Sequence, residues 1–127
     1  MAYPTGSGSE ILARTTIGAQ SSTATSFRWD GTMATLGTSS YTVPALHIIT
    51  VLNIIACSQA SVTEYINIRL NDGVSNKYIL DSAAIGGRQT FVFSDKLVLI
   101  GGDKLEVFTD AATDIHFICN YIDQDWT

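Results

Sequence analysis

The sequence has 127 residues, of which 46% are hydrophobic and only 15% are charged. This length predicts one domain with a core of its own, and the charged fraction lies well below the ~25% that is usual for soluble domains. The net charge is −5 and no basic cluster occurs, which argues against direct contact with nucleic acid.

Residues 1–10 (MAYPTGSGSE) are rich in Gly and Ser and lack the basic and apolar regions of a secretory signal. We therefore expect an extended start and a chain that is made in a cytoplasm. The longest apolar run, residues 46–57, is shorter than a bilayer span and contains His47 and Asn53, so we expect no membrane contact. The low charge favours a surface that is covered by partner proteins; a neutral surface rich in Ser and Thr is the alternative.

Residues 11–30 are rich in Thr, Ser and Ala, with two strand-like runs over 11–17 and 23–29. These runs fit two structures equally: edge strands of the chain's own sandwich, or an arm that lies on a neighbouring subunit. On the second alternative, we predict that the chain divides into an N-terminal arm, 1–40, outside the core, and a sandwich domain, 41–127. Under this hypothesis, deletion of residues 1–30 leaves the sandwich folded, and the arm binds its neighbour through apolar anchors: Ile11, Leu12, Ile17, Phe27 and Trp29.

The stretch from 46 to 70 contains the two clearest strand patterns. The run 46–57 is apolar on both alternating sides, which is typical of a strand that is covered on both faces. Strict alternation places Asn53 and Ile55 on the same side as Ile49. The run 65–70 alternates between apolar and polar residues, as expected of a half-buried strand.

The rest of the chain continues as short strands between turn signals that contain Gly, Asp or Asn. Further strands are predicted over 77–81, 89–93, 96–100, 104–109 and 114–122. No window shows a helical period, so the fold class is all-β: an antiparallel sandwich of jelly-roll type with an extended N-terminal arm. The predicted core residues are Ile49, Val51, Ile66, Ile68, Phe91, Leu97, Leu105, Val107, Ile115 and Phe117.

The residues that could perform chemistry do not form a recognisable constellation. Cys57 and Cys119 have only His47 and His116 as conceivable bases, and no nucleophile elbow is present. Asp114 and His116 share one strand face, but a metal site would need further ligands from other strands. We therefore predict no enzymatic activity, no metal and no cofactor. We interpret the two cysteines as buried free thiols. A disulfide between them is the alternative if their strands pair.

A family resemblance rests on strand and turn motifs between residues 41 and 122. These are residues 41–45 (YTVPA), the long apolar strand, the Asp72-Gly73 hairpin with its return at 78–80, and the segment 97–105. In these motifs the chain resembles small β-sandwich virion proteins of tailed bacteriophages. The resemblance implies a non-enzymatic capsid decoration (cement) protein that binds the outer face of the head shell as an oligomer, commonly a homotrimer, and stabilises it.

The resemblance also implies the partners and the location. They would be copies of the chain itself and the major capsid protein or another virion protein, in a virion that is assembled in the host cytoplasm. The alternative is a tail- or fibre-associated protein with an adaptor role or with a host glycan as ligand. Aromatic residues such as Trp29, Tyr65 and Trp126 would then stack on sugar rings if they were exposed.

Overall fold

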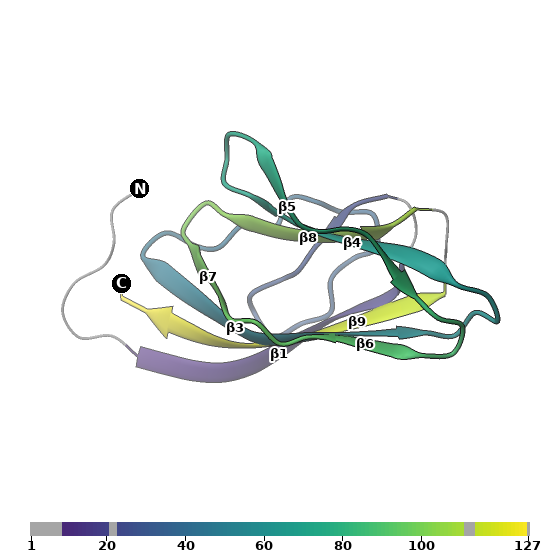
Figure 1. Cartoon of the computed structure of the whole chain (residues 1–127). Helices are drawn as coiled ribbons and strands as arrows, with labels where there is room; N and C mark the ends of the chain where they lie inside the picture. The colour runs from purple at the N-terminus through teal and green to yellow at the C-terminus, as the bar shows by residue number, and fades with distance from the viewer. Residues whose placement is uncertain (1–8, 21–22, 111–113, 127) are drawn as a thin grey trace.

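A computed structural model describes residues 9–20, 23–110 and 114–126, and these form two antiparallel sheets that pack face to face (Figure 1). The strands are β1 (Ser9–Gln20), β2 (Thr25–Ser26), β3 (His47–Ser58), β4 (Glu64–Asn71), β5 (Asn76–Ile85), β6 (Thr90–Phe93), β7 (Leu97–Ile100), β8 (Lys104–Thr109) and β9 (Ile115–Asp125). The first sheet has the order β1-β9-β3-β6, with β7 also paired to β3; the second has the order β2-β8-β4-β5. The predicted all-β sandwich of jelly-roll type is confirmed. None of the described residues forms a helix, so no helix among them is long and apolar enough to cross a bilayer.

The core lies between the two sheets and is filled by the inward side of each alternating strand. Eight of the ten predicted core residues are buried, as the alternation requires. The other two, Phe91 and Leu97, are only half-buried because β6 and β7 form an edge of the first sheet. Buried residues from the segment before residue 41 complete the core: Ile17, Phe27, Trp29 and Ala34.

A β-bulge in β3 changes which of its residues face the core. The pairing of β3 with β9 shifts between Val51 and Asn53, so that Leu52 is an extra residue. Beyond the bulge, Ile54 is buried whereas Asn53 and Ile55 lie on the other side. The prediction that Asn53 and Ile55 share a side with the core residues of β3 is therefore wrong.

The described part of residues 1–40 belongs to the sandwich rather than to an arm outside its core. Strand β1 pairs with β9 over its whole length, with a register shift after Ile17, and β2 pairs with β8. Phe27 is fully buried and Trp29 is only 7% exposed. Because the β1 backbone bonds to β9 and the two aromatic rings fill the core, the division into an arm, 1–40, and a sandwich, 41–127, is corrected. Residues 1–8 lie outside the described part of the chain.

Candidate interface

The two cysteines lie on opposite faces of the first sheet. Cys57 is exposed on the outer face, where it pairs in register with His116, and Cys119 is fully buried in the core. Burial raises the pKa of the Cys119 thiol far above its ordinary value. Both thiols are free, so the expectation of two buried thiols holds for Cys119 and is wrong for Cys57.

Titratable side chains gather at the end of the first sheet. His47 Nδ1 lies 2.8 Å from the Asp123 carboxylate, and its Nε2 lies 3.3 Å from Asp125. Asp114, which directly precedes β9, and His116, near the start of β9, are both exposed at the other end of the strand. In the described ranges, no group of three or more His, Cys, Asp and Glu side chains is arranged to hold a metal ion.

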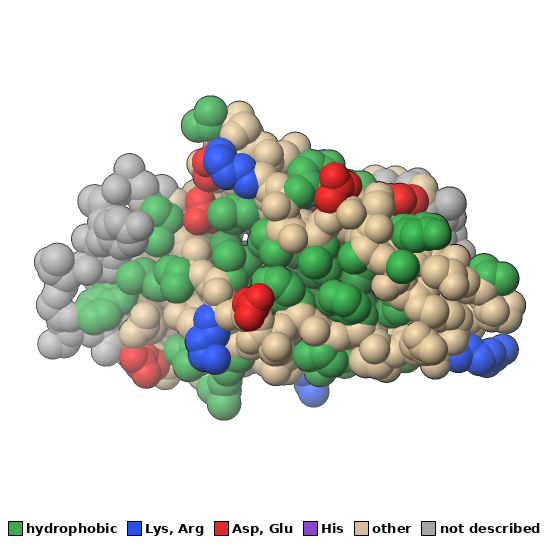
Figure 2. Space-filling view, in the orientation of Figure 1, with side chains coloured by type: hydrophobic (Ala, Val, Ile, Leu, Met, Phe, Trp, Pro, Cys, Tyr) green, Lys and Arg blue, Asp and Glu red, His purple; other side chains and the backbone are tan. Residues whose placement is uncertain are grey.

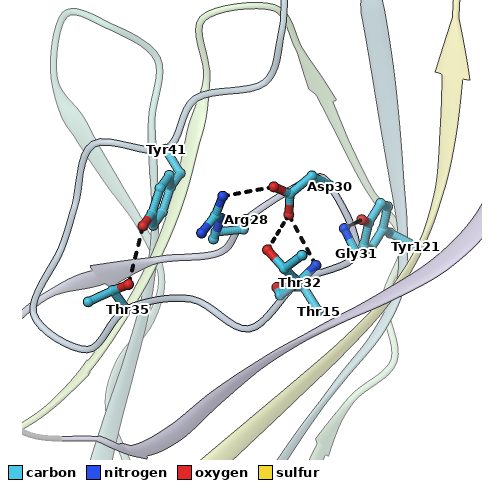
Figure 3. Close-up of polar contacts among 8 residues, drawn as sticks. All are labelled: Thr15, Arg28, Asp30, Gly31, Thr32, Thr35, Tyr41 and Tyr121. Carbon is cyan, nitrogen blue, oxygen red and sulfur yellow. Dashed lines mark hydrogen bonds and ion pairs between the residues drawn. The ribbon is translucent and has the colours of Figure 1, made fainter.

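The segment after β2 is held against β1 and β9 by a polar cluster (Figure 3). Asp30 accepts hydrogen bonds from the hydroxyl and backbone N–H of Thr32 and pairs with Arg28 at 2.8 Å. These hydrogen bonds, those from Thr32 foremost, hold the pKa of Asp30 below its ordinary value. The Thr15 hydroxyl of β1 donates to the Thr32 carbonyl at 3.0 Å, and Tyr121 of β9 accepts from a backbone N–H at 3.1 Å. The cluster fixes a loop to the sheet, and each member has a structural partner.

The three aromatic residues that would stack on a glycan, Trp29, Tyr65 and Trp126, differ in how much of their surface is exposed. Trp29 packs edge-on against Tyr121, with ring centroids 5.0 Å apart and an interplanar angle of 88°. Its faces are inside the core, so the expectation that Trp29 is an exposed platform is wrong. Tyr65 is exposed, and Trp126 is half-buried.

A buried amide closes the irregular pairing of β4 with β5. The Asn67 side chain donates to Asp110 at 2.8 Å and accepts from the backbone N–H of Ser82 at 2.8 Å. The Ser82 hydroxyl also donates to Asp110, at 2.9 Å, and Ser82 has a positive φ of 52°. These bonds satisfy the polar groups of the bulge. The Asp110 carboxylate, which accepts from the Ser82 hydroxyl, also accepts from the Asn67 amide, so we assign the cluster a structural role.

Glu64 provides a pH-dependent contribution to stability. One of its carboxylate oxygens is buried with no hydrogen-bond partner among the described residues, and burial, with the charge of Asp114, raises the pKa of Glu64 above its ordinary value of 4.5. A raised pKa in the folded state stabilises the folded chain below that ordinary value, and this stabilisation is lost as the pH rises through the raised pKa.

We expect Glu64→Gln, which keeps the shape of the side chain without its charge, to be more stable than the native chain at about pH 7 and similar to it at about pH 4. Urea unfolding at both pH values measures the difference. Asp81→Asn, at an exposed position of β5, is the matched control. A Glu64→Gln chain without added stability at neutral pH would contradict the assignment.

The outer face of the first sheet carries two largely apolar rows. Both cross β1, β9 and β3; the first ends on β7 and the second on β6. Cross-strand pairing places the first row at Leu12, Ile122, Thr50 and Val98, and the second at Thr16, Ile118, Ile55 and Val92. Val98 is 56% exposed, and Val92 is 54% exposed. A polar row runs between them, in which the Asn120 amide donates to Asn53 at 2.8 Å. We call this surface the outer face of the first sheet.

Charge is almost absent from this outer face. The chain has twelve acidic and seven basic residues. Among the described residues on the outer side of the first sheet, the charged ones are Glu10 and Arg14, both on the edge strand β1. The carboxylates of Asp123 and Asp125 belong to the opposite side of β9 and contact His47. An apolar sheet face with its charges confined to one edge is typical of an interface.

The side of the sandwich that carries β5, β6 and β7 is also apolar. Figure 2 shows hydrophobic side chains gathered in a band between the two layers on this side. The residues of β5, β6 and β7 that are partly buried against the core are Ile79, Leu80, Ala83, Phe91, Phe93 and Leu97. Since β6 and β7 contribute to both surfaces, the band adjoins the outer face of the first sheet.

The structure separates the five residues that were predicted as arm anchors. Ile17, Phe27 and Trp29 contribute to the core of their own chain. Ile11 and Leu12 are exposed on β1, by 59% and 73% of their surface. The contact of these residues with a neighbouring subunit stays a prediction, and in this conformation only Ile11 and Leu12 are free to make it.

No protein-family model matches the chain, and no curated protein matches it by sequence. Among solved structures, the acidic stable capsid structure of Helicobacter pylori bacteriophage KHP30 matches over 93% of this chain and 89% of that chain, with a TM-score of 0.50 and 8% identity. The chain is similar in fold to a bacteriophage capsid protein. At this identity the likeness concerns the fold alone.

Two further solved structures match with lower TM-scores. A pentameric capsid protein from metagenomic phage sequences matches over 91% of this chain at a TM-score of 0.38 and 16% identity, and the chain spans only 61% of that protein. The globular domain of zebrafish complement 1qA matches over 88% of this chain and 92% of that domain, with a TM-score of 0.48 and 16% identity. The neighbours therefore include viral capsid proteins and a complement domain of similar size.

Proposed function

We propose that the chain is a structural protein of a bacteriophage virion that works as an assembly of several copies. The observation that carries the proposal is the apolar, almost uncharged outer face of the first sheet on a jelly-roll sandwich. This face is about 19 Å wide and 33 Å long from the spacings of strands and residues, or roughly 600 Å². That area is comparable with the ~800 Å² that each partner contributes to a standard interface.

Within this role we propose a decoration (cement) protein that binds the head shell as a homotrimer and stabilises it. Its support is the resemblance over residues 41–122 together with the low charge of the surface. The main alternative is a tail- or fibre-associated protein with an adaptor or glycan-binding role, for which Tyr65 is the exposed aromatic residue. The copy number per particle separates the two: a decoration protein covers the head in many copies, whereas a tail component is present in few.

The proposed assembly predicts that one acidic substitution on the outer face dissociates the copies. We expect the native chain to form oligomers at micromolar concentration and Val98→Asp to raise the dissociation constant at least ~100-fold, since an unpaired buried charge costs several kcal/mol. Sedimentation velocity measures the oligomeric state. Val74→Asp is the matched control because Val74 is 92% exposed on the β4–β5 hairpin.

The native thiols report on the same face without a mutation. Cys57 is exposed on the outer face whereas Cys119 is buried, so a maleimide should label only Cys57. Its labelling rate should fall as the native chain assembles and stay high in the Val98→Asp chain. A native chain that remains monomeric, or a Val98→Asp chain that assembles normally, would contradict the proposal.

A further inference from the structure

The edge strand β1 has backbone groups without partners on one side. One side of β1 pairs with β9, and on the other side the Thr16 carbonyl accepts a hydrogen bond from the Ala34 N–H at 2.9 Å. In an antiparallel strand, alternate residues direct both backbone groups to the same side, so Glu10, Leu12 and Arg14 direct theirs away from β9 as well. Among the described residues, none bonds to these backbone groups. They form an open edge that can accept another strand.

The sequence of this edge is complementary to itself in the antiparallel direction. The segment reads Glu10-Ile11-Leu12-Ala13-Arg14. When it is paired with a second copy about a two-fold axis at Leu12, the two Leu12 residues face each other and Glu10 faces Arg14 of the second copy. Ile11 then faces Ala13. The charged pair occurs twice by symmetry, and opposite charges that face each other across two strands stabilise the pairing. The other two pairings bring apolar side chains together.

The side chains of this edge have exposed apolar surface and hydrogen-bonding capacity that such a pairing would use. Arg14 is exposed and has no hydrogen-bond or ion-pair partner among the described residues, while Glu10 accepts a bond from Gln124 at 2.8 Å and keeps a second oxygen for another donor. Leu12 and Ile11 are among the most exposed large apolar side chains of the chain. The second copy would cover these apolar groups and supply a carboxylate to Arg14.

Charge also selects one register of pairing. A shift by two residues places Glu10 or Arg14 opposite Leu12, and a shift by four places Glu10 opposite Glu10 or Arg14 opposite Arg14. Like charges directly opposite each other destabilise a strand pair. Only the register centred on Leu12 pairs opposite charges.

We propose that two copies of the chain dimerise by antiparallel pairing of their β1 strands over residues 10–14, so that the first sheet continues from one copy into the other. This inference rests on the proposed function. A two-fold contact cannot hold the three copies of a homotrimer together, so it would join a copy of one trimer to a copy of a neighbouring trimer. The loop at Thr32, which accepts a hydrogen bond from Thr15, and the bond from Ala34 cover the edge beyond Arg14. The new ladder therefore ends at Arg14.

A charge-reversal cycle on the full chain tests this pairing. We expect Glu10→Arg and Arg14→Glu, each alone, to weaken dimerisation at least ~10-fold, because each variant places like charges opposite each other at two symmetric positions. The double variant restores opposite charges and should return to within about threefold of the native affinity. Sedimentation equilibrium measures the dimer, and the thermal midpoint checks that all three variants fold.

Leu12→Pro tests the backbone part of the pairing. Proline removes the N–H of Leu12, which faces the open edge, and therefore removes no hydrogen bond to β9. We expect a folded chain whose β1–β1 dimer is lost. A double charge variant that stays as weak as the single ones, or a Leu12→Pro chain that dimerises like the native chain, would overturn the inference.

The two proposals fail in different ways. If Val98→Asp dissociates the assembly while the charge and proline variants leave it intact, the edge pairing is wrong and the proposed function stands. If the native chain is monomeric at every concentration, the assembly role and the edge pairing are both wrong. If the charge cycle behaves as expected and Val98→Asp has no effect, the copies meet through β1 rather than through the outer face of the first sheet.

Discussion

A chain that lacks residues 1–30 is expected not to fold. The deletion removes β1, which is the partner of β9 at the edge of the first sheet, and β2, which pairs with β8. It also removes Phe27 and Trp29 from the core. Loss of a buried aromatic side chain typically costs about 3–5 kcal/mol, whereas a whole domain is stable by only about 5–15 kcal/mol.

Circular dichroism and limited proteolysis of the truncated chain measure this effect. Deletion of residues 1–8, which removes none of the described strands, is the control and should keep the native thermal midpoint. The alternative hypothesis of an arm on a neighbouring subunit makes the opposite prediction for the 1–30 deletion. A truncated chain with a native midpoint would therefore show that β1 and the two aromatic residues are not required by their own sandwich.

A second large effect is expected at the ion pair between β4 and β8. Arg69 Nε donates to the Glu106 carboxylate at 3.1 Å, and the Glu106 side chain is only 4% exposed. The Arg69 guanidinium also lies over the ring of Phe108, 4.9 Å from its centroid. We expect Arg69→Met to destabilise the chain by about 3–5 kcal/mol, because it leaves a buried carboxylate without its counter-charge.

Urea unfolding at neutral pH measures the loss. In the double variant Arg69→Met, Glu106→Leu the unpaired charge is absent, so most of the stability should return. Lys77→Met is a suitable control, since the Lys77–Asp72 pair is exposed and such pairs contribute little. Equal losses for Arg69→Met and Lys77→Met would show that the Glu106 carboxylate reaches water in the variant.

The strands after residue 41 could be predicted because their side chains alternate strongly between apolar and polar. In β4 and β8 the buried positions Ile66, Ile68, Leu105 and Val107 follow this alternation directly. Each large apolar side chain there identifies the inward face by itself. The sequence was therefore sufficient for the strand positions, the fold class and most of the core.

The place of the N-terminal segment could not be decided from its pattern because polar residues fill its buried positions. Thr15, Thr25 and Ser26 are buried, and partners that are distant in the chain satisfy their hydroxyl groups. Thr25 accepts a bond from the Gly37 N–H at 2.8 Å, and Ser26 accepts one from the Tyr41 N–H at 3.1 Å. The pattern of apolar residues does not mark such positions, and it therefore predicts only weak core strands in this segment.

The candidate interface was predictable only in part. The sequence indicated a central strand that is apolar on both sides, and the outer side of β3 does lie in the uncharged face. The bulge at Leu52 reverses the sides of all later residues of β3, and no residue type in that run indicates an extra position. Hence the face could be expected, whereas its members beyond Val51 required the structure.

The position of β9 in the first sheet determines when that sheet can form during synthesis of the chain. This strand, the last of those described, lies between β1 and β3 in the first sheet, so neither has its ladder with β9 until residues 115–125 have left the ribosome. Contacts between the two ends of a chain form slowly because a long loop has to close first. The first sheet is therefore expected to form only after β9 has emerged, and a nascent chain without β9 does not yet display the surface through which copies would associate.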